Sequence, residues 1–422
     1  MNLLNDLLSR FGVGRLGVNA TYGSIGLGAR AVIQACYLIL LSRWMGAQGY
    51  GLFAGSVAAV LLVAPLSGWG VAYVLSRGVA HERSRSNGLW ANALVQITVT
   101  GAILSVVVVL VASLWMPERI SIVSLLLLAV AELLLLPMAQ ACTSLCFALD
   151  RGLSASFAIC LVPLGRLLTA LAFVSTGAAG ESGTVALSHL LGSIVGMSGA
   201  VVLIAIIDGL PAWRQRRPIR ETLSKGTSYA LGALVGTSYM EVDKVFMLQM
   251  LGAAVVGPYT AAFRVASVFV LPISALASAV LPRLFASHGG SQGRATLKAM
   301  AWASLAYGFV AMLTVACISP LMPRIFGADF AGASNYLLCL AAWPLLFALH
   351  QAAATGLTGF DRQHARVAVE SVGLLLAIAL NAVLMQRYGA NASVMALLAT
   401  EAFMAGVCMV LLRAMRKQPD SS

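Results

Sequence analysis

The chain has 422 residues, of which 60% are hydrophobic and only 10% are charged. Soluble domains hold roughly 45–50% apolar and about 25% charged residues, so a soluble chain of this length would lack the polar surface it needs. This composition excludes a soluble globular protein, a disordered chain, a collagen-like repeat and a secreted disulfide scaffold, and it indicates a polytopic membrane protein. The net charge of +12 would suggest nucleic acid in a soluble protein, but here it is first compared with the positive-inside rule.

Twelve apolar runs between polar breaks are long enough to cross a bilayer as helices, which takes about 20 residues each. Pro65 and Pro272 fall inside the second and eighth runs, where a proline is expected to kink the helix. The expected fold is therefore an all-α polytopic membrane protein with twelve transmembrane helices. The expected spans are 20–41, 51–76, 89–115, 120–147, 154–175, 184–207, 228–251, 257–282, 298–319, 333–357, 367–387 and 393–412.

The two halves of the chain resemble each other in sequence. Residues 41–77 align without a gap on residues 247–283. Matched positions are Gly46 with Gly252, Gly51 with Gly257, Arg77 with Arg283 and, after a small shift of register, Asp150 with Asp361. Six helices separate equivalent points, so the halves run in the same direction, as in parallel repeats related by a pseudo-two-fold axis along the membrane normal. We expect two six-helix lobes, 1–207 and 228–422, joined by a basic linker, 208–227.

The basic residues alternate in a way that predicts the orientation. If the N-terminus is inside, 19 of the 27 Lys and Arg residues fall in inner segments, 4 in outer segments and 4 within spans. Inner loops of membrane proteins carry this excess of Lys and Arg. The sequence therefore predicts that both termini lie inside, and it accounts for the net charge without a nucleic-acid partner.

Three cations within the expected spans are candidate substrate-binding residues. Ionisable side chains inside a span are costly and usually face a cavity or a partner. Arg30 is expected roughly 18 Å from the outer end of its helix. Lys244 and Arg264 are expected on two adjacent helices, each roughly 10 Å from the short outer loop over 251–257. Such cations suit an anionic substrate, because a guanidinium binds phosphate oxygens two at a time. The alternative for Lys244 is local pairing with Glu241, three residues before it on the same helix face.

Four carboxylates and one further arginine complete the set of intramembrane charges. Asp243 lies about 200° around the helix from Glu241, so one of the two is expected to face the other lobe. These acids either couple a proton or sodium gradient or form structural ion pairs. Glu132, Arg166 and Glu401 are single charges in their helices, and Glu132 and Arg166 are expected to pair.

The sequence predicts no catalytic residue, no metal site and no cofactor. Its five histidines and seven cysteines show no metal-ligand spacing. Polar and aromatic residues within spans are candidates to line a wet cavity, or else they only pack helices. These candidates are Gln34, Tyr37, Asn92, Gln96, Tyr239 and Tyr307.

Residues 239–283 resemble a known family. The pair Asp243-Lys244, followed by Leu251-Gly252, Gly257, Tyr259, Ala262, Arg264, Pro272 and Pro282, is similar to the seventh and eighth helices of Wzx-type polysaccharide flippases, which belong to the multidrug/oligosaccharidyl-lipid/polysaccharide exporter superfamily. The segment GAQGYGLF, 46–53, looks like the turn between the first two helices of that family. The layout fits over essentially the whole chain, whereas the motifs cover about 80 residues and are loose.

The resemblance implies a function in the bacterial cytoplasmic membrane. Family members move a polyprenyl-pyrophosphate-linked oligosaccharide, as used for O-antigen and other polysaccharides, from the inner to the outer leaflet by alternating access of a central cavity. The implied partners are this lipid-linked substrate, the bilayer and other polysaccharide-assembly proteins. Two alternatives stay open: a drug or cation antiporter of the same superfamily, which favours acidic cavity residues, and an integral-membrane glycan polymerase or ligase, which usually needs a large outer loop with Arg and His.

Overall fold

The computed structural model describes residues 15–115, 121–215, 219–286 and 290–415, which form helices and short connections without a strand among them. These residues confirm the all-α fold. The chain forms two compact units, one made of residues 1–45 and 56–237 and the other of residues 46–55 and 238–422. The boundary between the units falls inside a helix after the basic linker, so the first turns of that helix pack with the first unit.

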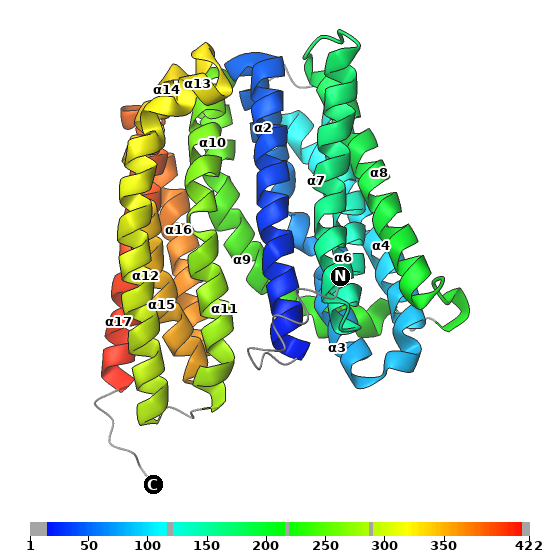
Figure 1. Ribbon diagram of the computed structural model, residues 1–422. Helices are drawn as coiled ribbons and strands as arrows, with labels where there is room; N and C mark the ends of the chain where they lie inside the picture. The colour runs from blue at the N-terminus through cyan, green and yellow to red at the C-terminus, as the bar shows by residue number, and fades with distance from the viewer. Residues whose placement is uncertain (1–14, 116–120, 216–218, 287–289, 416–422) are drawn as a thin grey trace. The chain divides into compact units, whose positions relative to one another are not determined.

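The first unit holds most of the helices of the first half of the chain (Figure 1). Its core lies among α3, α4, α6, α7 and α8, and α7 and α8 share the most extensive packing. Gly165, Gly192 and Gly196 bring the backbones of α7 and α8 together, as small residues do in membrane helix pairs. The elements are the start of α2 (Arg15–Leu61), η1 (Ala64–Gly70), α3 (Val71–His81), η2 (Arg83–Arg85), α4 (Ser86–Trp115), α5 (Ile122–Val130), η3 (Ala131–Leu135), α6 (Leu136–Ala148), α7 (Gly152–Ser175), α8 (Ser182–Asp208), η4 (Trp213–Gln215) and the start of α9 (Ile219–Leu251).

The second unit contains the rest of α9 and the helices that follow it. Here α15 packs against both α12 and α17, and α10 packs against α14. Small side chains on α15, including Ala353 and Ala354, form part of the apolar core with α17. The elements after α9 are α10 (Ala253–Val268), α11 (Leu271–Ala286), α12 (Ser291–Ile318), η5 (Ser319–Leu321), α13 (Met322–Phe326), η6 (Ala328–Phe330), α14 (Ala331–Leu340), α15 (Trp343–Gly359), α16 (Gln363–Tyr388) and α17 (Asn391–Met415).

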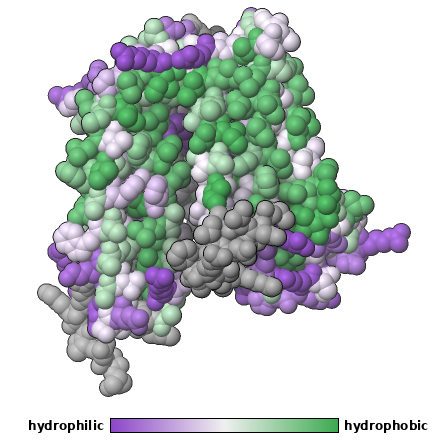
Figure 2. All heavy atoms as spheres, viewed as in Figure 1, coloured by the Kyte–Doolittle hydropathy of each residue, from purple (hydrophilic) through white to green (hydrophobic). Residues whose placement is uncertain are grey.

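The lengths and apolar surfaces of the helices fit a multi-pass membrane protein. Within the described ranges, nine helical stretches are long and apolar enough to cross a membrane, or ten when the bent pair Ala328–Leu340 and Trp343–Gly359 forms one span. The stretch Thr21–His81 is broken at Gly46, so it holds two of the expected spans. The other expected span is α9, which is long but more polar. Hydrophobic side chains cover the visible helix lengths, and hydrophilic ones gather toward the helix ends (Figure 2).

The repeated sequence motifs adopt the same local backbone in both halves. Gly46 and its counterpart Gly252 break their helices at φ 68° and 83°, with ψ near 177° and 169°. Asp150 and Asp361 are both left-handed, at φ 58° and 61°. Each is followed by a residue whose N–H donates back to a carbonyl five positions earlier, which is a helix-ending Schellman bond. The predicted breaks at the two prolines are also present, at η1 and between α10 and α11.

The repeated glycines Gly51 and Gly257 meet each other within the second unit. A Cβ on Gly51 would collide with the backbone of Ala253 and Gly257, and a Cβ on Gly257 would collide with the backbone of Ala47. Since Ala47 and Ala253 are themselves repeat counterparts, the contact is reciprocal. The segment of α2 that follows Gly46 therefore crosses the start of α10 with the two backbones in direct contact.

Alanine at either crossing glycine is expected to destabilise the protein. The added Cβ of Gly51→Ala or Gly257→Ala meets backbone atoms, which cannot rotate away, so we expect a loss of about 1–3 kcal/mol. Gly406→Ala is the control, because its Cβ would meet nothing within 4 Å and alanine favours a helix. The melting temperatures of the purified variants and of the control, determined by thermal unfolding in detergent, measure this loss of stability. Equal melting temperatures for Gly51→Ala, Gly257→Ala and the control would contradict the close crossing.

Candidate functional site

Arg30 lies at the midpoint of the first helical segment of α2, which runs from residue 15 to the break at Gly46. Its side chain is exposed, and within the described ranges it makes no hydrogen bond or ion pair. Arg166 and Glu132 lie within electrostatic range of its guanidinium, and Cys160 of α7 lies beside it. Arg30 is thus a cation in the middle of a membrane helix whose hydrogen-bonding groups remain available to an anion.

Glu132 is the centre of a buried polar cluster in the first unit. It lies in η3, a π-helical turn between α5 and α6, and such turns occur frequently at functional sites. Its Oε1 accepts from Arg166 Nη1 at 2.9 Å, which confirms the expected pair. The same oxygen lies 2.8 Å from His189 Nε2, and Arg166 Nε also donates to Ser193 at 2.8 Å.

Tyr37 extends this cluster to α2. Its hydroxyl lies 2.7 Å from His189 Nδ1. A neutral imidazole fits both contacts, since it accepts from Tyr37 at Nδ1 and donates to Glu132 at Nε2. Tyr37, Glu132 and His189 are buried, so the cluster joins α2, η3 and α8 inside the first unit and offers little surface to a substrate.

Lys244 is fully buried in the second unit, with a relative exposure of 0%. Its ammonium lies 3.0 Å from Asp243 Oδ1 and 3.5 Å from Glu241 Oε2, and it also donates to the Met240 carbonyl. The ring of Phe263 covers it, with the nitrogen 3.7 Å from the ring centroid. The local pairing with Glu241 considered from the sequence is therefore present. In this conformation Lys244 has no surface to offer a substrate.

Asp243 and Glu241 both point into the second unit, although one of them was expected to face the other lobe. Asp243 accepts from Tyr259 through Oδ2 and contacts Lys244 through Oδ1. Glu241 accepts from Arg264 Nη2 at 3.0 and 3.3 Å. The physical reason is the length of the lysine and arginine side chains, which reach carboxylates on two sides of α9.

Arg264 keeps part of its side chain accessible. Its relative side-chain exposure is 33%, whereas that of its partner Glu241 is 6%. Only one of its terminal nitrogens is used by Glu241. Within the described residues, Arg264 is therefore the cation of the second unit's cluster that has surface left for an anion.

Glu401 is enclosed by a second carboxylate–histidine cluster. Its Oε2 lies 2.9 Å from His350 Nδ1, and its Oε1 accepts from Tyr239 at 3.1 Å and from Trp343 Nε1 at 3.3 Å. Its relative exposure is 0%. This network ties α9, α15 and α17 together within the second unit.

The depths of the arginines differ from those expected. The turn before α10 consists of Gly252 alone, whereas a loop over 251–257 was expected, so Arg264 lies about 18 Å along its helix from that turn. By the same rise per residue, Arg30 lies about 24 Å from Gly46 and Lys244 about 12 Å from Gly252. The connection is shorter than the expected loop because Gly252, with φ 83°, can join two helices through a single residue.

Other polar residues have structural partners. Gln96 donates to the Gly68 carbonyl at 2.8 Å and accepts from Thr222. Tyr37 and Tyr239 hydroxyls are used by His189 and Glu401. The two buried histidines were not singled out from the sequence. In the sequence each of these histidines is visible only as a single polar residue inside an apolar run. No regular spacing connects either histidine to its carboxylate partner.

A family profile described as "Polysaccharide biosynthesis protein" matches residues 16–288, well over half of the chain. The chain belongs to this family. The resemblance drawn from the sequence is thereby confirmed. Among curated protein sequences none matches the chain.

Solved structures share the fold at low identity. A multidrug resistance MATE family transporter of the MOP superfamily, solved in an inward-facing conformation, has 14% identity and a TM-score of 0.77, covering 92% of this chain and 96% of its own. A MATE protein in complex with MaL6 has 13% identity and a TM-score of 0.68, over 95% and 97%. A MOP superfamily transporter from Pyrococcus furiosus has 14% identity and a TM-score of 0.66, over 94% and 95%. The chain is thus a multi-pass membrane protein with a MOP superfamily transporter fold.

Proposed function

We propose that this protein flips a polyprenyl-pyrophosphate-linked oligosaccharide from the inner to the outer leaflet of the bacterial cytoplasmic membrane by alternating access. Family membership supports a role in polysaccharide biosynthesis, and the transporter fold supports movement of a substrate rather than a covalent reaction. The positive-inside pattern supports termini on the inner side of the membrane.

Arg30 carries the proposal. An exposed guanidinium in the middle of a membrane helix, with no ion-pair partner in the described residues, is costly and calls for an anionic ligand. A pyrophosphate fits, because Arg binds two of its oxygens at once. Moving such a dianion through a low-dielectric slab without a cation would cost several kcal/mol or more.

Arg264 is the second residue we assign to the substrate. Its remaining exposed surface supports a separate contact with a phosphate group within the second unit, and Glu241 moderates its charge and orients it. We assign Lys244 the role of holding Asp243 and Glu241 in place, because it is buried and already paired.

The drug-antiporter alternative differs in the sign of the available charge. The Pyrococcus furiosus transporter is described as having a binding pocket of reverse polarity, on which a different function is suggested for it. In the present chain the intramembrane carboxylates Glu132, Glu241, Asp243 and Glu401 are buried and hydrogen-bonded, whereas the accessible groups are arginines. This pattern favours an anionic substrate over a cationic drug. Coupling to a proton or sodium gradient stays a prediction.

Reconstitution tests the proposal directly. The purified protein is placed in proteoliposomes with a fluorescent polyprenyl-pyrophosphate-linked oligosaccharide, and a membrane-impermeant quencher reports which leaflet holds the label. We expect label to move between leaflets faster than in protein-free liposomes, with the glycan unchanged in length. Liposomes loaded with ethidium and given a proton or sodium gradient serve as the drug-transport arm. Dye efflux without lipid movement would favour the antiporter, and a lengthened glycan would favour a polymerase.

A further inference from the structure

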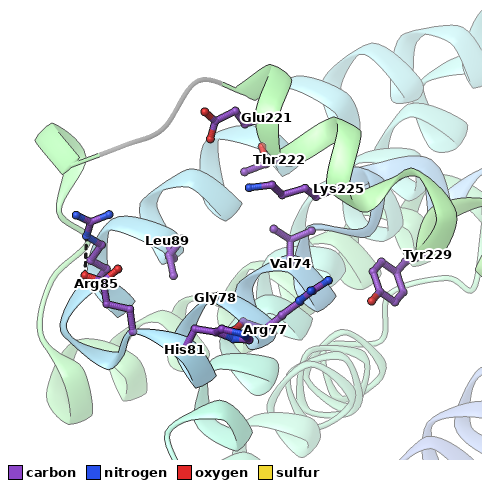
Figure 3. Close-up of a pocket in the computed structure, with 11 residues that line it drawn as sticks. Val74, Arg77, Gly78, His81, Arg85, Leu89, Glu221, Thr222, Lys225 and Tyr229 are labelled. Carbon is purple, nitrogen blue, oxygen red and sulfur yellow. Dashed lines mark hydrogen bonds and ion pairs between the residues drawn. The ribbon is translucent and has the colours of Figure 1, made fainter.

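A cavity of about 370 Å³ opens at one end of the first unit, away from the residues discussed above. Its walls come from α3, from η2 and the start of α4, and from the first three turns of α9 (Figure 3). The volume falls within the range of about 300–1,000 Å³ that is usual for small-molecule sites. This is the end of the unit at which α3 and α8 stop and α4, α7 and α9 begin.

Two cations in this cavity have no side-chain partner in the part of the chain that the structure describes. Arg77 and Lys225 reach into it from opposite walls, Arg77 from α3 and Lys225 from α9 (Figure 3). Both side chains are exposed, and within the described residues neither makes a side-chain hydrogen bond or an ion pair. Arg85 also lines the cavity but is paired with Glu82 at 3.0 Å. An exposed Arg and an exposed Lys from separate helices, both uncommitted, form a two-sided anion receptor.

Apolar side chains line part of the cavity, beside the polar residues His81, Glu82, Glu221 and Thr222. Val74 and Leu89 line it, and Tyr229 stands at its edge. The ring of Tyr229 stacks on that of Tyr73, with centroids 4.8 Å apart and planes 8° from parallel, and both rings are exposed. Tyrosines gather where membrane meets water. The cavity therefore combines cations with apolar side chains at the ends of membrane-spanning helices, which suits an amphiphile better than a free ion.

The α9 wall is fixed to the rest of the first unit. Thr222, a buried lining residue, donates to Gln96 of α4, and Trp69 Nε1 donates to Thr227 at 3.0 Å. A Cβ on Gly226 would collide with the Trp69 carbonyl, so the backbones are in contact there. These contacts hold the segment carrying Lys225 against α4 and η1. Lys225 is thus presented by a preorganised helix rather than by a flexible linker.

We propose that this cavity binds the pyrophosphate end of a polyprenyl pyrophosphate in the inner leaflet, as a loading site separate from Arg30. The phosphate oxygens contact Arg77 and Lys225, and the first isoprenoid units lie against Val74 and Leu89. The assignment of the lipid rests on the proposed function. Glu221 also lines the cavity, so its negative charge favours a ligand such as a pyrophosphate, whose several negative charges keep the net interaction with Arg77 and Lys225 attractive.

Farnesyl pyrophosphate, a short polyprenyl pyrophosphate, is the probe. Its binding to the intact protein in nanodiscs of pure phosphatidylcholine is measured by isothermal titration calorimetry. Arg77→Gln and Lys225→Gln are each expected to weaken binding about tenfold, since a hydrogen bond to a charged group is worth about this much. Arg283→Gln is the matched control. Arg283 is the repeat counterpart of Arg77, its side chain is exposed, and it does not line this cavity. It is expected to bind within twofold of wild type.

Further arms identify the source of the phosphate. Farnesol lacks the anion and inorganic pyrophosphate lacks the apolar chain, so both are expected to bind at least about tenfold more weakly than farnesyl pyrophosphate. Leu89→Asn, which removes apolar surface without adding a charge, is expected to weaken binding of farnesyl pyrophosphate but not of inorganic pyrophosphate. Equal binding of the inorganic ion and the lipid, or full competition by nanodiscs containing phosphatidylglycerol, would overturn the assignment. Unchanged binding by both cation variants, with melting temperatures like wild type, would overturn the site.

The outcome is separable from that of the proposed function. Arg30→Ala leaves this cavity intact, so it is expected to keep the component of probe binding that Arg77→Gln and Lys225→Gln weaken, even where lipid movement stops. If the cavity variants bind normally while wild type still flips the lipid-linked oligosaccharide, only the loading site is wrong. If wild type binds the probe through Arg77 and Lys225 but moves no lipid-linked glycan, the cavity stands and the flippase assignment fails.

Discussion

Replacing Arg30 with alanine is expected to abolish transport of the lipid-linked oligosaccharide while leaving the amount of folded protein unchanged. Arg30 is exposed and makes no hydrogen bond or ion pair with the described residues, so its removal breaks no native contact. Surface substitutions of this kind usually change stability by no more than about 0.5 kcal/mol. Two charge-assisted bonds to a pyrophosphate are worth about 3 kcal/mol or more together, which corresponds to more than about 100-fold in transport rate.

Arg30→Lys separates charge from geometry. Lysine keeps the positive charge but loses the planar fork that binds two phosphate oxygens, so we expect partial rescue. The measurement is surface glycan in a strain deleted for its own flippase, normalised to the protein in the membrane. Arg283→Ala is the control, since it removes an exposed arginine outside the proposed site. Wild-type glycan from Arg30→Ala at equal expression would refute the role of Arg30, whereas loss of glycan with Arg283→Ala as well would point to a general requirement for charge.

The helices and their repeats were predictable from the sequence because they depend on local chemistry. A bilayer requires long apolar runs, and the matched glycines and aspartates mark backbone positions that need positive φ. Gly46 with Gly252 and Asp150 with Asp361 adopt such conformations at both repeats. The reciprocal collision at Gly51 and Gly257 was not predictable, because it depends on how two helices cross rather than on either sequence alone.

The candidate site was predictable in its residue types but not in its pairings. Glu132 and Arg166 on adjacent helices pair as expected. From sequence spacing alone, the side chain of Lys244 could face a cavity or pair with Glu241. Its contacts with Phe263 and Asp243, which depend on tertiary packing, show that it is buried and paired. The histidine partners of Glu132 and Glu401 lie 57 and 51 residues away in the chain, so no local pattern could have linked them.

The burial of Lys244 leads to a second large expected effect, this time on stability. Lys244→Met removes the cation that neutralises Asp243, while Glu241 retains Arg264. Asp243 is then left with the Tyr259 hydroxyl as its described side-chain partner. Breaking one side of a buried ion pair typically costs about 3–5 kcal/mol, because the remaining charge is uncompensated. We expect a strongly lowered melting temperature and a reduced yield of monodisperse protein.

The double variant Asp243→Asn/Lys244→Met makes this prediction discriminating. Removing both charges leaves a neutral pair of similar volume, and such replacements of buried ion pairs are often neutral or stabilising. The double variant is therefore expected to recover most of the melting temperature lost by Lys244→Met. Because Lys244 has no accessible surface, we also expect the double variant to keep transporting the lipid-linked glycan. A double variant that is as stable as wild type but inactive would show that one of the two residues acts in transport, Asp243 in ion coupling or Lys244 on the substrate, in a conformation other than the one described here.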